Sequence, residues 1–247
     1  MKHNAIRRKQ LGSTLIELMV ALGILALVMA GVFSQLTNAM QRLSTEQTKV
    51  DNFDEARDFV DQFFRDINQI GYPDGHIVTT TVSPAIQDQR LAVGLVKISA
   101  TSIAFEGDIN GSGVVQEVQY QINGSGSCTL CFQRSAVPKV SSVDPLAQMS
   151  LNPVWGTEVN DLTNNTTTSP IFTYYDANGA VVSPPADIDS SPATIARVKT
   201  IHISLTIQNN QVMDPKTGQP IQTSFEGEVS LNNCSMATTL VPPMSCF

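Results

Sequence analysis

The most reactive side chains in the sequence are four cysteines, Cys128, Cys131, Cys234 and Cys246. An even set in an exported chain favours disulfides over free thiols, and three pairings are possible. We favour Cys128 with Cys131, which closes a very small loop, and Cys234 with Cys246, which ties down the C-terminal tail. The rival is a zinc site with four thiolates, but the second pair is too widely spaced for a zinc knuckle. A thioredoxin-like site is disfavoured because no helix opens at Cys128 after a βαβ strand.

A second set of potential ligands lies in Asp108-Ile109-Asn110-Gly111-Ser112-Gly113. Oxygen ligands at alternate positions, namely Asp108, Asn110 and Ser112, followed by glycine at the sixth position are typical of the start of a calcium loop. The twelfth position is Gln119, which lacks the bidentate carboxylate. We therefore favour a hairpin loop between two strands and keep calcium as the alternative; the chain is otherwise assigned no metal.

The three histidines, His3, His76 and His202, have no Ser, Cys or carboxylate pattern around them that suggests a triad or a metal motif. His202 shares one strand face with Thr200 and Ser204, which is typical of a solvated strand histidine. Acidic residues are scattered and form no convergent pair for acid–base chemistry. The sequence predicts a protein that is not an enzyme and needs no cofactor.

The N-terminal segment holds a carboxylate in an unusual place. Residues 1–11 are polar and basic, and from Leu18 to Phe33 an apolar run of about sixteen residues without charge is nearly long enough to cross a membrane. Glu17 lies at the start of this run, where burial in hydrocarbon costs roughly 2.5 to 3.5 kcal/mol and calls for a partner. A secretory signal would be cleaved after the run, but residues 26–31 match such a site poorly. Gly12 separates the basic and apolar parts.

The segment Leu11-Gly12-Ser13-Thr14-Leu15-Ile16-Glu17-Leu18 resembles the cleavage and methylation motif of type IV prepilins and type II secretion pseudopilins. The resemblance implies that a prepilin peptidase cuts after Gly12, that Ser13 becomes the N-methylated terminus, and that Glu17 is the fifth mature residue. Members of this family most often have Phe at the position of Ser13, which makes methylation less secure than cleavage. In the family this glutamate is thought to pair with the N-terminal amine of a neighbouring subunit, which would offset its burial.

The same resemblance implies a location and partners. The basic leader predicts that residues 1–12 are cytoplasmic and that the rest lies outside a bacterial inner membrane, with a single span and a periplasmic C-terminal domain. The expected partners are the prepilin peptidase, the inner-membrane assembly platform and other pilins or pseudopilins. The subunit would wait in the membrane and then enter a pilus or pseudopilus.

Beyond Phe33, apolar residues recur at three-, four- and seven-residue steps as far as Ile67, which predicts an amphipathic helix. It should continue to about Ile70, where Gly71 and Pro73 stop it. Its first half is expected to project and its second half to pack on a sheet. We divide the chain into a leader (1–12), an N-terminal helix (13–70, with about 15–34 transmembrane and 35–70 amphipathic) and a β-rich globular domain (71–247).

Downstream, β-branched or alternating runs separated by turn residues predict an antiparallel sheet, and so an α+β, pilin-like fold. Long surface loops are expected over 141–169 and 181–192, which are rich in Pro, Asn, Thr and Ser. An adhesive ligand for the polar loops around Asn164 is a further possibility without a specific signal. The predicted strands are Leu91 to Ile98, Ser102 to Glu106, Val114 to Ile122, Cys131 to Arg134, Ile171 to Tyr175, Val198 to Gln208 and Phe225 to Leu231.

The charge of the chain argues against nucleic-acid binding. Four of the 15 basic residues and none of the 22 acidic residues precede Gly12, so removal of the leader changes the net charge from -7 to -11. Such a charge repels phosphate backbones, and no basic cluster with interleaved aromatics occurs downstream.

The stretch from Phe53 to Ile67, followed by Gly71-Tyr72, resembles the corresponding region of PilW-type minor pilins, in which an Arg-Asp step and a Gly-Tyr pair close the first helix. Here the Arg-Asp step is Arg65-Asp66. The resemblance implies a minor type IV pilin that assists pilus assembly, with indirect roles in adhesion or twitching motility. The alternative is a pseudopilin of the type II secretion system.

Overall fold

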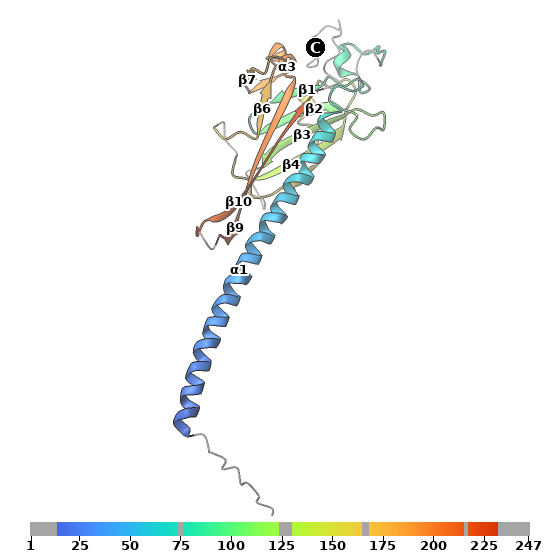
Figure 1. The fold of residues 1–247 in the computed structure, drawn as a ribbon. Coiled ribbons are helices and arrows are strands. Elements are labelled where there is room, and N and C mark those ends of the chain that lie inside the picture. Colours follow the sequence, from blue (N-terminus) through green and yellow to red (C-terminus); the bar gives the residue numbers. More distant parts are fainter. Residues whose placement is uncertain (1–13, 74–76, 124–129, 165–167, 215–216, 232–247) are drawn as a thin grey trace, which may run out of the picture.

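The computed structural model describes residues 14–73, 77–123, 130–164, 168–214 and 217–231. Its dominant element is α1 (Leu15–Ile67), a helix of 53 residues. Figure 1 shows the N-terminal half of α1 extending away from every strand, while its C-terminal half lies along the globular domain. Buried helix residues begin at Thr45. The expectation of a projecting first half and a packed second half is therefore confirmed.

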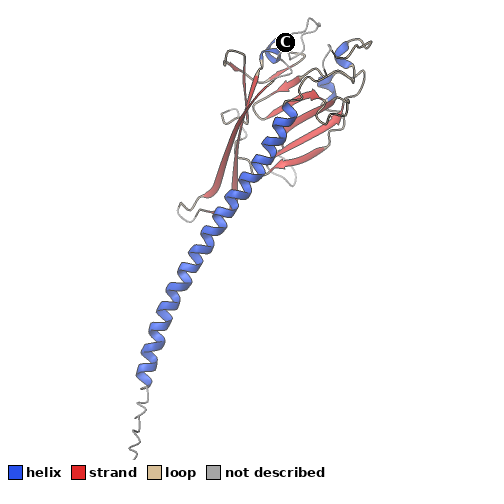
Figure 2. Ribbon diagram, turned by 45° about the vertical axis from the view of Figure 1, so that its right-hand side comes forward, coloured by secondary structure: helices blue, strands red, loops and turns tan. Residues whose placement is uncertain are grey.

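The globular domain contains two antiparallel sheets, seen as two groups of strands beside the helix in Figure 2. The six-stranded sheet has the order β5-β4-β3-β2-β1-β8, and the four-stranded sheet has the order β10-β9-β6-β7. The expected α+β architecture, a long N-terminal helix with antiparallel sheets, is confirmed and is consistent with a pilin-like fold. The strands are β1 (Leu95–Ile98), β2 (Ser102–Gly107), β3 (Gln116–Asn123), β4 (Cys131–Pro138), β5 (Trp155–Val159), β6 (Phe172–Tyr175), β7 (Val181–Val182), β8 (Ala186–Asp187), β9 (Thr200–Met213) and β10 (Pro220–Ser230).

The seven predicted strands correspond to β1, β2, β3, β4, β6, β9 and β10, with shifted ends. The prediction of long loops is wrong in part. The first loop contains α2 (Pro145–Gln148) and β5, and the second contains β7, β8 and the start of α3 (Pro192–Arg197). Strand β5 lies at the edge of its sheet and is largely exposed, so its residues carry no clear alternation of apolar and polar types.

The helix and both sheets meet around a cluster of aromatic rings. The ring centroid of Phe63 on α1 lies 5.3 Å from that of Tyr120 on β3 and 5.4 Å from that of Phe172 on β6. One turn earlier, Phe59 lies 5.0 Å from Phe132 on β4. Edge-to-face and stacked pairs of this kind add about 0.5–1.5 kcal/mol each beyond the area that they bury. Two helix residues therefore join the two sheets into one core.

The helix ends at Ile67, three residues before the expected end, with Asn68 as its C-cap. Gly71 then takes a left-handed conformation (φ 74°), and its N–H donates to the carbonyl of Glu106 on β2 at 3.0 Å. A bridge between Ile70 and Gly107 continues this contact. The segment that follows the helix is thus hydrogen-bonded to the C-terminal end of β2.

Replacing Gly107 with alanine should lower the free energy of unfolding by about 1–3 kcal/mol, the usual range for overpacking. A Cβ atom at Gly107 would lie 2.3 Å from the carbonyl oxygen of Gln69, a backbone atom that cannot move without disturbing the bridge. Gly156→Ala on β5 is the matched control, because its nearest contact would be at 3.9 Å. Chemical unfolding of both variants, followed by Trp155 fluorescence, measures the difference. Equal stability of the two variants would contradict the prediction.

Candidate functional site

The candidate site starts with the first turn of α1. Thr14 is the N-cap, and its hydroxyl oxygen accepts a hydrogen bond from the backbone N–H of Glu17 at 3.4 Å. Glu17 is the acidic residue of this turn, where the positive end of the helix dipole favours a carboxylate. Its side chain is exposed. The geometry therefore gives Glu17 a role at the helix start and leaves its carboxylate accessible to a second molecule.

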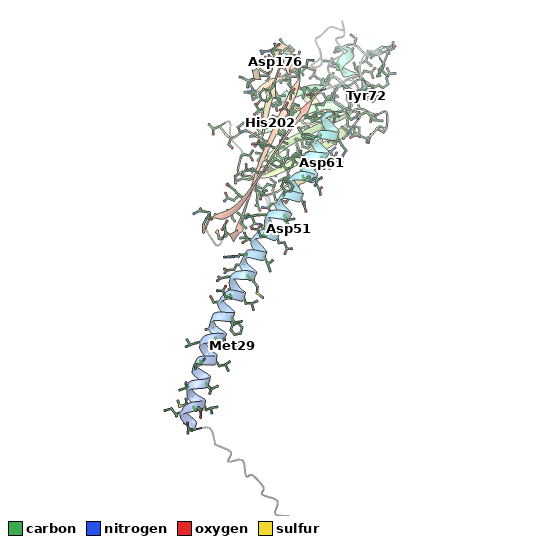
Figure 3. All side chains as sticks on the ribbon, in the orientation of Figure 1. Met29, Asp51, Asp61, Tyr72, Asp176 and His202 are labelled. Carbon is green, nitrogen blue, oxygen red and sulfur yellow. The ribbon has the colours of Figure 1, made fainter. Side chains whose placement is uncertain are left out.

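The residues that follow form an apolar surface without a partner in the subunit. An 18-residue window of α1 has a mean hydropathy of 2.5 and none of it is buried. Leu15 is 78% and Leu27 75% exposed, and Met29 lies on the part of the helix that stands clear of the strands in Figure 3. By length and composition this helix can cross a membrane once, which is consistent with the single-pass anchor of a pilin.

Residues 7–33 match the family model described as the prokaryotic N-terminal methylation motif. The motif is the prepilin signal of pilin-like proteins. No curated protein and no solved structure matches the chain.

The match spans Gly12, Ser13 and Glu17 and most of the exposed apolar helix, and it ends before the globular domain. It supports a type IV pilin-like or pseudopilin-like protein, a structural component of a filament. It implies processing by a prepilin peptidase and assembly with other pilins. The resemblance to the prepilin signal is thereby confirmed, whereas the PilW-type subgroup has no support from the match.

The predicted cleavage and methylation residues, Gly12 and Ser13, lie outside the described residues, so their roles stay predictions. The same holds for Cys128, Cys234 and Cys246. Cys131 is buried at the start of β4 and is not a free thiol. The disulfide pairing stays a prediction.

The loop from Asp108 to Gly113 connects β2 to β3, which pair antiparallel, so the hairpin interpretation is confirmed. The two carboxylate oxygens of Asp108 accept hydrogen bonds from the backbone N–H groups of Ser112 (3.0 Å) and Gly113 (2.7 Å). The side-chain oxygen of Asn110 accepts from Ser112 as well, at 3.1 Å. These bonds give the loop its shape without a cation. Calcium binding stays an alternative prediction that the geometry does not require.

The described residues contain no group of three or more His, Cys, Asp or Glu side chains arranged to hold a metal ion. His202 lies on β9, directly opposite Thr173 of β6 and Glu228 of β10, and is half-buried. Figure 3 shows it far from the first turn of the helix. The features that bear on function therefore gather on α1.

The structure adds a polar anchor that the sequence analysis did not single out as a site. Asp66 on α1 is 1% exposed, and its Oδ2 atom accepts hydrogen bonds from the Tyr120 hydroxyl at 2.7 Å and from Arg134 Nε at 2.8 Å. Its Oδ1 atom accepts from Gln62 at 2.6 Å. Burial, followed by the negative charge of Asp66, raises the pKa of Tyr120 well above its usual value, so the hydroxyl stays a donor. The anchor fixes the helix to β3 and β4.

A signal for this anchor exists in the sequence. Asp66 falls on the same helix face as Phe59, Phe63 and Ile67, where an apolar residue is expected. An acidic side chain in phase with a buried stripe needs a cationic partner. The sequence alone gives no way to choose Arg134 among the other basic residues, because that contact joins residues 68 positions apart.

Proposed function

We propose that this chain is a minor, PilW-like type IV pilin that joins other pilins in a filament and assists its assembly. The observation that carries the proposal is the methylation motif at the start of an apolar helix that the subunit leaves wholly exposed. Such a helix is stable in a bilayer or among other apolar helices, and costs free energy in water at about 25 cal/mol per Å² of exposed apolar surface. Its exposure is suited to a subunit that moves from a membrane into a filament.

In this proposal the leader of residues 1–12 stays in the cytoplasm until the peptidase cuts after Gly12, and the globular domain of residues 71–247 is periplasmic. Ser13 becomes the methylated terminus, and the accessible carboxylate of Glu17 pairs with the terminal amine of a neighbouring subunit. The ion pair offsets the cost of burying a carboxylate among apolar side chains. The assembly platform in the inner membrane then draws the subunit into the filament.

The cysteines contribute stability outside the cell in the same scheme. We propose disulfides between Cys128 and Cys131 and between Cys234 and Cys246. Disulfides persist in the oxidising periplasm and at the cell surface, where a filament subunit works without the reducing systems of the cytoplasm.

The second candidate is a pseudopilin of the type II secretion system, because the methylation motif occurs in both classes. The resemblance of Arg65-Asp66 and Gly71-Tyr72 to PilW-type pilins favours the pilus. A strain deleted for the gene separates the two: surface pili are counted by electron microscopy, and secreted proteins are measured in the same cultures. We expect pili to be lost with secretion intact, and restored by the gene in trans. Normal pili with blocked secretion would make the chain a pseudopilin.

A further inference from the structure

Two glutamates face each other inside the six-stranded sheet. Glu106 near the end of β2 and Glu117 near the start of β3 are directly opposite in the antiparallel register, and each is 0% exposed. Side chains at such positions have Cβ atoms about 4.5–5.5 Å apart, and like charges there are destabilising. The two strands lie side by side near the end of α1 in Figure 1. The pair therefore needs compensation from its surroundings.

Lys139 supplies one positive charge, and only one of its three N–H donors reaches the glutamate pair. Its ammonium group, buried with the residue, donates to Glu106 Oε2 at 2.6 Å and to the backbone carbonyls of Ile86 at 2.7 Å and Leu91 at 2.8 Å. A lysine ammonium has three protons. All of them are engaged, so Lys139 has none left for Glu117.

Each glutamate keeps one oxygen without a donor. Glu106 Oε2 accepts from Lys139 and from the Val93 N–H at 3.0 Å, whereas Glu106 Oε1 is buried and unpartnered. Glu117 Oε1 accepts from Gln119 Nε2 at 2.8 Å, whereas Glu117 Oε2 is buried and unpartnered. A buried polar atom without a partner is destabilising, and more so when it carries charge. A single hydrogen shared by these two facing side chains would satisfy both acceptors.

We propose that Glu117 is a buried proton-binding site: it carries a proton on Oε2 and donates it to Oε1 of the ionised Glu106. One proton then satisfies both oxygens and leaves the group formed by Glu106, Glu117 and Lys139 without net charge. A metal ion is a poorer occupant, because only two oxygens remain available whereas calcium takes six to eight.

The electrostatics agree with this assignment. Burial, and next the charge of Glu106, raise the pKa of Glu117 to about 8, against the lowering by Gln119 and Lys139. Burial raises the pKa of Glu106 too, but there the Lys139 ammonium acts in the opposite direction, and Asp144 at the start of α2 adds a small raising effect. The proton therefore belongs to Glu117 at neutral pH, and Glu106 keeps the salt bridge.

This proton-binding site lies where several chain segments are hydrogen-bonded to Glu106 and Lys139, a meeting point that we call the junction. The backbone of Glu106 accepts from Gly71 after the helix, its side chain binds Val93, and Lys139 binds the segment that contains Ile86 and Leu91. Loss of the proton would leave a negative charge in a dry site below these contacts. The folded-state pKa is raised, so the stabilisation is complete below pH about 4.5 and is lost as the pH rises through about 8. The junction is thus sensitive to alkaline pH.

The test compares three full-length proteins in detergent: wild type, Glu117→Gln and the control Glu226→Gln, which changes an exposed glutamate on β10. The amide of Glu117→Gln supplies the donor that the proton supplies in wild type. From pH 5 to pH 9 we expect the folding equilibrium constant of wild type and control to fall relative to that of Glu117→Gln by roughly 1,000-fold, since each pH unit between 5 and the folded-state pKa of about 8 is worth tenfold. Parallel pH profiles of all three proteins would overturn the proposal.

Infrared spectroscopy supplies a readout that does not depend on stability. Wild type at pH 7 should show the stretching band of a protonated carboxyl group, which weakens as the pH is raised past about 8. The band should be absent from Glu117→Gln and present in Glu226→Gln. Absence of the band from wild type at pH 6 would mean that water or a cation, and not a proton, satisfies the two oxygens, and would overturn the proposal.

Discussion

Replacing Gly12 with leucine is expected to leave residues 1–12 attached to the membrane protein and to remove it from the filament. Glycine has no Cβ, so it lets a peptidase approach the backbone closely and bind it in conformations that other residues resist. With the leader retained, Ser13 has no free amine to pair with Glu17 of a neighbour. Immunoblots of membrane and sheared-filament fractions should show a larger protein in the membrane and at least a tenfold loss from filaments, as expected when an ion pair worth over about 1.4 kcal/mol is lost.

Gly31→Leu is the matched control, because it makes the same change at a glycine of α1 where a Cβ atom would meet nothing within 4 Å. It should be processed like wild type, and mass spectrometry of its N-terminus should give methylated Ser13. A Gly12→Leu protein of wild-type size would refute the cleavage site, whereas an uncleaved protein found in filaments at the wild-type level would refute the need for the free terminus.

Replacing Asp66 with alanine should destabilise the subunit by about 3–5 kcal/mol, the usual effect of removing one partner from a buried ion pair. Arg134 and the Tyr120 hydroxyl would lose the carboxylate oxygen that both contact, and Gln62 would lose its acceptor as well. The lower stability should appear as a lower midpoint of chemical unfolding of the full chain in detergent, followed by near-ultraviolet circular dichroism.

Asp61→Ala provides the control on the same helix. Asp61 pairs with Arg57 at 4.0 Å, but both side chains are more than half exposed, so the loss should be below about 0.5 kcal/mol. The double variant Asp66→Ala, Arg134→Ala should cost less than the sum of its single variants, because neither charge is then left alone. Additive losses, or equal losses for Asp61→Ala and Asp66→Ala, would refute the anchor.

The two buried salt bridges of the globular domain have different consequences for the helix. Asp66 and Arg134 join α1 directly to the six-stranded sheet, whereas Glu106 and Lys139 hold the segments that follow the helix and flank the sheet. Together these contacts connect α1 to the globular domain. The buried ion pairs and the aromatic cluster around Phe63 give that connection both rigidity and a fixed register.

The N-terminal helix could be predicted from the sequence because its determinants are local. The motif around Gly12 and Glu17 occupies adjacent residues, and an apolar run specifies a membrane-length helix whatever follows it. The seven strands were likewise predictable, since each is a β-branched or alternating run bounded by turn residues. The match to the methylation motif rests on these same local residues.

Only the tertiary structure decided the rest. Strand β5 exists because β4 offers it an edge, and its own sequence carries little signal. Asp66 with Arg134, and Glu106 with Glu117 and Lys139, are ionisable residues whose burial depends on partners in other elements of the fold. The physical reason is that local sequence determines which backbone conformations are low in free energy. The pairing of buried charges depends instead on which strands meet, and that is a property of the whole fold.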